Sequence, residues 1–214
     1  MYNRNRSLMV NHVKEYAIVY LFMIILFLTG IIFGAIIVNS MNFVQKQDLF
    51  FYLERFFKQI VEGQTIESNL ILKESFLYHA RFLFLLFLLG LSVIGLPLVW
   101  GLIYVKGLVV GFSVGFLVNQ LGMKGLLLSA LSIAPQNFII IPIYIIAGTL
   151  SMVFSLTLLN KLFSRRPTNP VYEPFIKYVF LFVLLLGISF IASTIEAYVA
   201  NGSLETLIES FYKQ

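Results

Sequence analysis

Long apolar stretches, separated by short charged segments, dominate the pattern of residues along this chain. Between Lys124 and Lys161 no residue is charged and none is histidine. A stretch of about 20 apolar residues already crosses the hydrocarbon of a bilayer, and a soluble core helix is rarely so long and uncharged. The pattern therefore predicts helices embedded in a membrane.

About five transmembrane helices fit the spacing of the charges. The first span has no small-residue cleavage pattern at its end, so we interpret it as a retained helix rather than a signal peptide. The second contains Gly95 and Pro97 and is expected to be kinked. The break between the third and fourth spans is placed around residues 132–137. The predicted spans are residues 16–38, 82–104, 107–128, 138–159 and 178–198.

The composition agrees with this interpretation. Hydrophobic residues make up 59% of the chain and charged residues only 12%, and there is no cysteine. Strands of a membrane β-barrel would give alternating segments of about 10 residues, a pattern that is absent. The predicted fold is an all-α polytopic helical bundle forming one membrane domain over residues 1–214. The lack of cysteine excludes disulfides, iron–sulfur clusters and thiolate zinc sites.

The basic residues predict the orientation of the chain in the membrane. Short cytoplasmic segments are enriched in lysine and arginine. An N-terminus inside and a C-terminus outside place the basic segments in the cytoplasm, including the loop 160–177, and leave segments 39–81 and 199–214 outside. The residues on which this prediction rests are Arg4, Arg6, Lys14, Lys106, Lys161, Arg165, Arg166 and Lys177.

The external segment between the first two spans contains an amphipathic pattern. Over residues 47–60 the apolar side chains fall on one helical face and most charged ones lie away from it. Residues 66–79 are expected to form a second helix, giving an external helical hairpin. Its apolar face either contacts a partner or packs on the ends of the chain's own spans. The candidate partner contacts are Leu49, Leu53, Phe56 and Phe57.

Glycines spaced four residues apart occur in two of the predicted spans. Such glycines let two helix backbones approach closely within a membrane. The face formed by them serves either a homodimer or packing within one chain. The glycines are Gly30 and Gly34 in the first span and Gly107, Gly111 and Gly115 in the third.

Polar residues within the apolar stretches are candidates for function, because such residues are costly inside a membrane. Pro135, Gln136 and Asn137 form either a re-entrant polar element that lines a cavity or the N-terminal cap of the fourth helix. Glu196 follows serines at helical spacing and lies near the predicted outer surface. Lys124 lies near the same surface and is a candidate partner for Glu196.

No catalytic motif is found in the sequence. His12 and His79 fall on opposite sides of the membrane in the predicted topology, and no serine has an evident base. A metal held outside the membrane by His79 with Glu74 or Glu196 is a minor alternative. There is no phosphate-binding glycine-rich loop. We therefore expect neither an enzyme nor a protein with a cofactor.

Several blocks in order along almost the whole chain resemble the stage II sporulation protein M family of endospore-forming bacteria. Among them are Pro135-Gln136-Asn137 and Glu196-Ala197-Tyr198. The others are residues 20–22, 33–40, 45–50, 94–97, 106–112 and 115–120.

The resemblance implies a role in engulfment, when the mother-cell membrane migrates around the forespore. It implies a multi-pass anchor in the cell membrane at the sporulation septum. That anchor would recruit two peptidoglycan-degrading partners, stage II sporulation proteins D and P. The alternative function is a small transporter or channel component that uses the polar break at residues 135–137, since interrupted helices mark transport sites.

Overall fold

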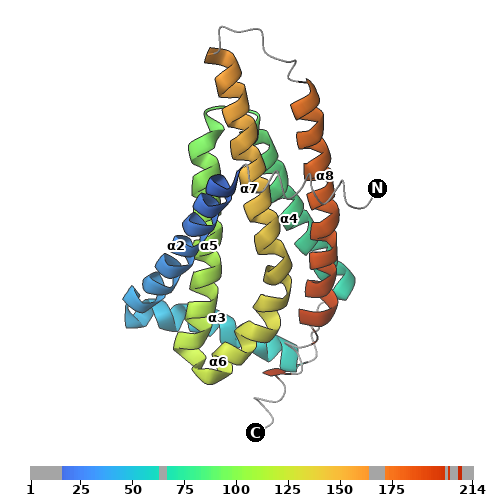
Figure 1. Cartoon of the computed structure of the whole chain (residues 1–214). Helices are drawn as coiled ribbons and strands as arrows, with labels where there is room; N and C mark the ends of the chain where they lie inside the picture. The colour runs from blue at the N-terminus through green and yellow to red at the C-terminus, as the bar shows by residue number, and fades with distance from the viewer. Residues whose placement is uncertain (1–15, 63–66, 164–171, 201, 203–206, 209–214) are drawn as a thin grey trace.

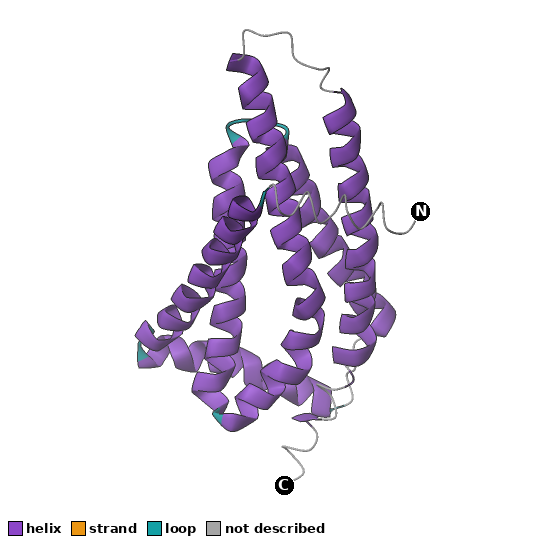
Figure 2. Ribbon diagram, viewed as in Figure 1, coloured by secondary structure: helices purple, strands orange, loops and turns teal. Residues whose placement is uncertain are grey.

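The chain folds as a bundle of long helices, described here from a computed structural model (Figures 1 and 2). The structure describes residues 16–62, 67–163, 172–200, 202 and 207–208. The helices in these segments are α2 (Ala17–Ser40), α3 (Phe43–Val61), α4 (Ser68–Gly90), α5 (Gly95–Leu121), α6 (Met123–Leu128), α7 (Ala134–Phe163) and α8 (Tyr172–Ile195). Two π-helical turns, η1 (Ser129–Ile133) and η2 (Glu196–Ala200), precede α7 and follow α8. The all-α prediction is confirmed.

The long helices run up and down between two ends of the bundle. In Figure 1, α2 descends to α3, which lies across the lower end, and α4 ascends. Helix α5 then descends, the continuous run α6–η1–α7 ascends, and α8 descends again. We call the two ends of the bundle the α3 end and the opposite end. The short connection 91–94 and the last turn of α7 lie at the opposite end.

Helices α2 and α5 meet along their glycines. A Cβ atom on Gly30 or Gly34 would overlap the backbone of α5, and one on Gly107 or Gly111 would overlap the backbone of α2 near Phe27 and Ile31. Gly115 lies against Ala35 of α2. Where two helix backbones approach this closely, they gain dispersion contacts with each other. Larger side chains would hold the backbones apart and prevent those contacts. Of the two roles predicted for these glycines, the structure shows packing within one chain.

The predicted second span is wrong, because the chain reverses in the middle of it. Helix α4 ends at Gly90, a short turn follows, and α5 begins at Gly95, whose Cα lies against the backbone of Leu89. Pro97 therefore does not kink a helix. It lies in the first turn of α5, where a backbone N–H would have no partner inside the helix. The reversal contains no charged residue, so hydropathy gave no sign of it.

The predicted third span and the break at residues 132–137 are also wrong. The chain reverses at Gly122, whose φ of 58° and ψ of −129° suit only glycine. From Met123 the helix continues to Phe163 through the π-helical turn. Pro135 follows that turn directly, where the backbone is already irregular and a missing N–H is tolerated.

Among the residues that the structure describes, four helical stretches are long and apolar enough to cross a membrane. They are α2, α5, the run Met123–Phe163 and the run Tyr172–Tyr198. Helix α4 does not meet this measure, although it packs along α7 and α8 in the bundle. The charged residues Lys73, Glu74 and Arg81 make α4 too polar to meet it. The second helix of the predicted external hairpin is thus the start of α4, which continues into the bundle.

Helix α3 packs on the end of the bundle through the face that was predicted to bind a partner. Phe57 and Ile60 are buried in a small cluster with Leu117 and Leu128, and Leu53 packs against it. Leu49 is half-buried and Phe56 is more exposed. Asn42 caps the helix in a reciprocal arrangement with Gln45. Most of this face therefore packs on the ends of the chain's own membrane helices, which was the predicted alternative to a partner contact.

The larger core surrounds α7, the most buried of the membrane-length stretches. Hydroxyl groups of this helix contact α4 and the connection that follows it: Ser151 Oγ lies 2.9 Å from the carbonyl oxygen of Leu86 in α4, and Ser155 Oγ donates to that of Ser92 in the connection. Tyr178 of α8 donates to the carbonyl of Phe87. These bonds satisfy polar groups that lipid could not.

Some predictions concern residues outside those that the structure describes. They include the N-terminal basic residues with His12, the arginines at 165 and 166, and most of the acidic tail 199–214. Their predicted side of the membrane stays a prediction.

Candidate functional site

A polar cavity of about 510 Å³ lies between α4, α5, α7 and the end of α8. Its charged and histidine side chains are Glu74 and His79 from α4, Lys106 from α5 and Glu196 from η2. Hydroxyl and carboxamide groups line it too, together with apolar residues of α2, α5 and α7. The other polar lining residues are Ser75, Tyr78, Ser113, Gln136, Asn137 and Tyr144.

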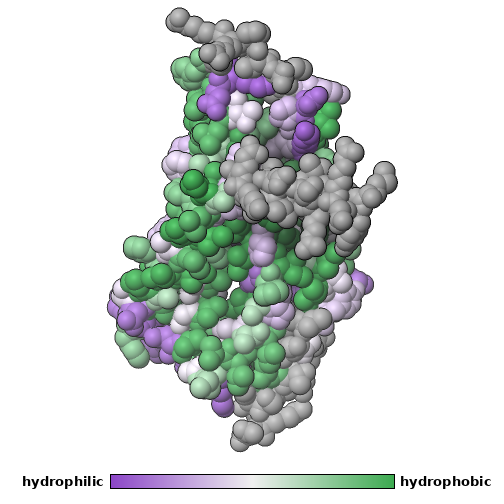
Figure 3. Space-filling model, in the orientation of Figure 1, coloured by the Kyte–Doolittle hydropathy of each residue, from purple (hydrophilic) through white to green (hydrophobic). Residues whose placement is uncertain are grey.

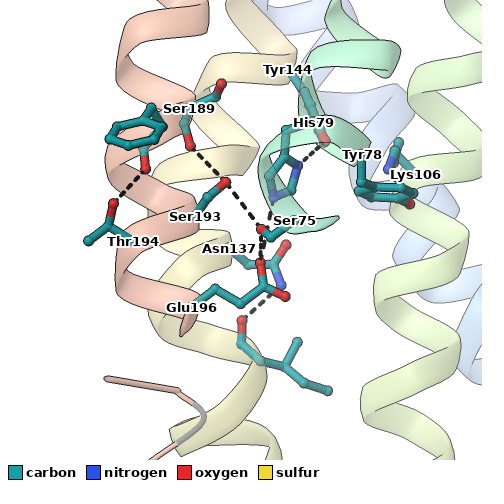
Figure 4. Close-up of polar contacts among 12 residues, drawn as sticks. Ser75, Tyr78, His79, Lys106, Asn137, Tyr144, Ser189, Ser193, Thr194 and Glu196 are labelled. Atoms are coloured by element: carbon teal, nitrogen blue, oxygen red, sulfur yellow. Dashed lines mark hydrogen bonds and ion pairs between the residues drawn. The ribbon is translucent and has the colours of Figure 1, made fainter. Parts of the chain in front are cut away.

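Glu196 is the centre of hydrogen bonding on one side of the cavity (Figure 4). Ser75 of α4 donates to its carboxylate, and Ser75 Oγ lies 3.1 Å from Ser193 Oγ of α8. With its amide nitrogen turned toward the carboxylate, Gln136 donates to both oxygens of Glu196. The serine stripe predicted along α8 thus joins α8 to α4. A carboxylate inside a helical bundle is stable only when hydrogen-bond donors surround it in this way.

His79 links that carboxylate to α7. Its Nδ1 lies 2.6 Å from the hydroxyl oxygen of Tyr144, and its Nε2 lies 3.8 Å from Oε2 of Glu196. The side chain is only 6% exposed, and Nε2 has no hydrogen-bond partner among the described residues. A buried polar nitrogen without a partner costs free energy. This atom is therefore available to a ligand in the cavity.

Lys106 lies on the other side of the cavity, within a cage of aromatic rings. Its Nζ donates to the Tyr78 hydroxyl at 2.6 Å and is 4.0 Å from the centre of the same ring. The rings of Phe82 and Tyr144 have their centres at 4.5 and 5.0 Å. Cation–π attraction stabilises an ammonium group that is partly removed from water. The prediction that Lys106 lies at a cytoplasmic boundary is wrong, because it lies within α5 and lines the cavity.

The polar residues predicted from the sequence fall in different places. Gln136 and Asn137 both line the cavity, and Asn137 Nδ2 donates to the carbonyl of Ile133 at 2.8 Å. They belong to the first turns of α7 that continue from η1, so they form neither a re-entrant turn nor an N-terminal cap. Lys124 is exposed at the start of α6, whereas the contacts of Glu196 are with Ser75, Gln136 and His79.

The sequence pattern did not lead us to expect that α4 lines the cavity. Ser75, Tyr78 and His79 are spaced by three and four residues and so share one helical face. That spacing was a usable signal, but the segment was assigned to an external hairpin. His79 and Glu196, considered as a minor metal pair, do come together. The described residues hold no group of three His, Asp or Glu side chains able to bind a metal ion.

The arrangement can bind and orient polar groups of either charge inside an apolar bundle. On the face drawn in Figure 3 the surface of the bundle is mostly apolar, with hydrophilic residues gathered toward the two ends. Long apolar helices packed through glycines around a polar cavity define a polytopic helical membrane protein. The chain belongs to the stage II sporulation protein M family, whose family model matches residues 23–201. It is accordingly a sporulation-related membrane protein. No curated protein and no solved structure matches it.

Proposed function

We propose that this protein is a non-enzymatic membrane anchor of the engulfment machinery, located in the membrane at the sporulation septum. In this role it recruits the peptidoglycan-degrading stage II sporulation proteins D and P, so that the mother-cell membrane can migrate around the forespore. Membership of the stage II sporulation protein M family supports a role in sporulation. The observation that carries the proposal is the position and exposed face of α3.

Helix α3 presents an outward face at one end of the bundle. While Phe57 and Ile60 face the bundle, Phe51 and Tyr52 are 60% and 68% exposed. Lys58 and Glu54 form an ion pair of 3.0 Å in the same helix. Exposed aromatic residues beside charged ones are typical of protein interfaces. The partner contact is thus proposed for this outward face rather than for the face predicted from the sequence.

The charges of the described segments support an external position for α3. Acidic and basic residues are balanced in α3 and the start of α4, whereas toward the opposite end Lys161 and Lys177 are opposed by Glu173 alone among the described residues of α7 and α8 there. By the positive-inside rule this distribution supports an extracytoplasmic position for the α3 end. Enzymes acting on peptidoglycan work on that side of the membrane, which supports the outward face of α3 as their proposed contact.

Co-purification tests the proposal. The full chain and the two hydrolases are solubilised together in mild detergent, and retention of the hydrolases is measured. The double variant Phe51→Ser/Tyr52→Ser should lose most of the retained hydrolase. The control Phe163→Ser/Tyr172→Ser removes two aromatic residues at the opposite end that are at least as exposed, and it should retain the hydrolases. Equal retention by both variants, or no retention by the unaltered chain, would contradict the proposal.

A second candidate function is a small transporter or channel component. The observation that favours it is the cavity holding His79, Lys106 and Glu196 within the bundle, since ionisable residues inside membrane segments mark ion and substrate pathways. Solute flux in proteoliposomes that contain only this chain would support transport. The anchor proposal predicts no flux in such vesicles.

A further inference from the structure

A second cavity adjoins the polar one and differs from it in chemistry. It has a volume of about 340 Å³ and lies between α5 and the run α6–η1–α7. Val110, Ile133, Asn137 and Ile141 line both cavities, so the two share a wall. The remaining residues of the second cavity are almost all apolar: Val114, Leu126, Ser129, Ala130, Ala134 and Phe138.

The polar cavity carries charges of both signs on opposite sides. Figure 4 shows Lys106 beside Tyr78 on one side of His79 and Glu196 on the other. Glu74 adds a second, exposed carboxylate. A ligand with a single charge would meet a like charge somewhere in this cavity. A zwitterion meets complementary charges on both sides.

His79 provides an independent sign of a ligand. Its Nε2 is buried without a hydrogen-bond partner among the described residues and faces the Glu196 side of the cavity. If Tyr144 donates to Nδ1, then Nε2 carries a proton and faces the Glu196 carboxylate. If Nδ1 donates to Tyr144, then Nε2 is an acceptor beside that carboxylate. In that second tautomer, a primary ammonium placed between the two donates to both, which is the arrangement that calls for a ligand.

From these features we propose that the two cavities form one binding site for a zwitterionic aminophospholipid, such as phosphatidylethanolamine. The phosphate binds near Lys106, and the ammonium binds near Glu196. An acyl chain occupies the adjoining apolar cavity. The apolar cavity favours a lipid over a free amino acid or a soluble phosphoester, because only the lipid has a hydrocarbon chain to fill it.

The inference goes beyond the anchor function and does not depend on it. No residue of α3 lines either cavity, so lipid binding and partner binding can be measured separately.

Native mass spectrometry of the full, delipidated chain in detergent tests the site. The probes are phosphatidylethanolamine, phosphatidylcholine and phosphatidylglycerol with the same acyl chains, and soluble glycerophosphoethanolamine as the head group alone. The primary ammonium donates hydrogen bonds to carboxylates, which a quaternary ammonium cannot do. We expect phosphatidylethanolamine to bind about tenfold more tightly than the other two lipids and far more tightly than the head group alone.

Variants separate the two cavities. Lys106→Met keeps the bulk of the side chain, removes its charge and should weaken phosphatidylethanolamine about tenfold. Lys73→Met, at an exposed position of α4 outside the cavity, should leave the affinity unchanged. Ala130→Phe fills the apolar cavity and should weaken the lipid while leaving the charges in place. Helical content and elution volume confirm that each variant is folded.

Three results would overturn the inference. Equal binding of all three lipids would mean general lipid solvation of the bundle. Binding of the soluble head group as tight as that of the lipid would show that the apolar cavity is not part of the binding site. Unchanged affinity of a folded Lys106→Met chain for phosphatidylethanolamine would show that the charged cavity is not part of it. Should that variant not fold, Lys106→Gln replaces it, with the same expected loss of affinity and the same contradicting result.

Discussion

His79 on α4 lies with its Nε2 3.8 Å from the carboxylate Oε2 of Glu196, which follows α8. This pair joins two helices that are distant in sequence, and Tyr144 and Ser75 extend it to α7 and along α4. The hydrogen bonds of these two residues connect α4, α7 and the end of α8, and the residues form one side of the cavity.

The energetic coupling of this pair can be measured by a double-mutant cycle. His79→Gln and Glu196→Gln should each lower the free energy of unfolding in detergent by about 1–2 kcal/mol. The double variant should lose clearly less than the sum, because both changes remove the same interaction. Glu62→Gln combined with His79→Gln serves as the control and should be additive. A coupling energy near zero for the first pair would show that the contact does not contribute.

The glycine contact between α2 and α5 predicts a contrast between two alanine variants of one helix. Gly111→Ala places a Cβ against the backbone of Ile31 and should lower the free energy of unfolding by about 1–3 kcal/mol. Nothing lies within 4 Å of a Cβ added at Gly101, so Gly101→Ala should be neutral or stabilising by up to about 1 kcal/mol. Thermal unfolding in detergent measures both. Equal midpoints would contradict close packing at Gly111.

The reversal at Gly122 predicts a cost for any side chain there. Its backbone conformation is closed to L-residues, so Gly122→Ala should destabilise the chain by about 1–3 kcal/mol although nothing lies near the added methyl group. Gly187→Ala in α8 is the matched control, also in open space but with ordinary helical φ, and should not destabilise. If the helix instead continued through residue 122, the first variant would stabilise the protein.

The topology can be tested by cysteine labelling, because the natural chain has no cysteine. Lys58→Cys on α3 should react with a membrane-impermeant maleimide in intact cells, and Leu162→Cys only after permeabilisation. Val105, beside Lys106 within α5, is exposed on the outside of the bundle, and Val105→Cys should resist labelling in both conditions because we expect lipid to cover it. Strong labelling at position 105 after permeabilisation would show that this part of α5 lies at the cytoplasmic surface, as the sequence pattern predicted for Lys106.

The sequence predicted several local features correctly because their causes are local. The amphipathic pattern of residues 47–60 gives helix α3, and the four-residue glycine spacing gives a face for close packing. The polar residues Gln136 and Glu196 were selected because such groups are costly in a membrane, and both line the cavity. Which helix each feature would meet could not be derived, since that depends on neighbours far away in the chain.

The sequence by itself determined an all-α membrane protein, because apolar length and the scarcity of charge suffice for that conclusion. Only the tertiary structure decided where the chain reverses, since the turns at residues 91–94 and at Gly122 contain no charged residue. It also decided that His79, Lys106 and Glu196 share one cavity. An ionisable side chain inside a bundle is stabilised by the donors, acceptors and aromatic rings that other helices bring to it, and those neighbours exist only once the helices have packed.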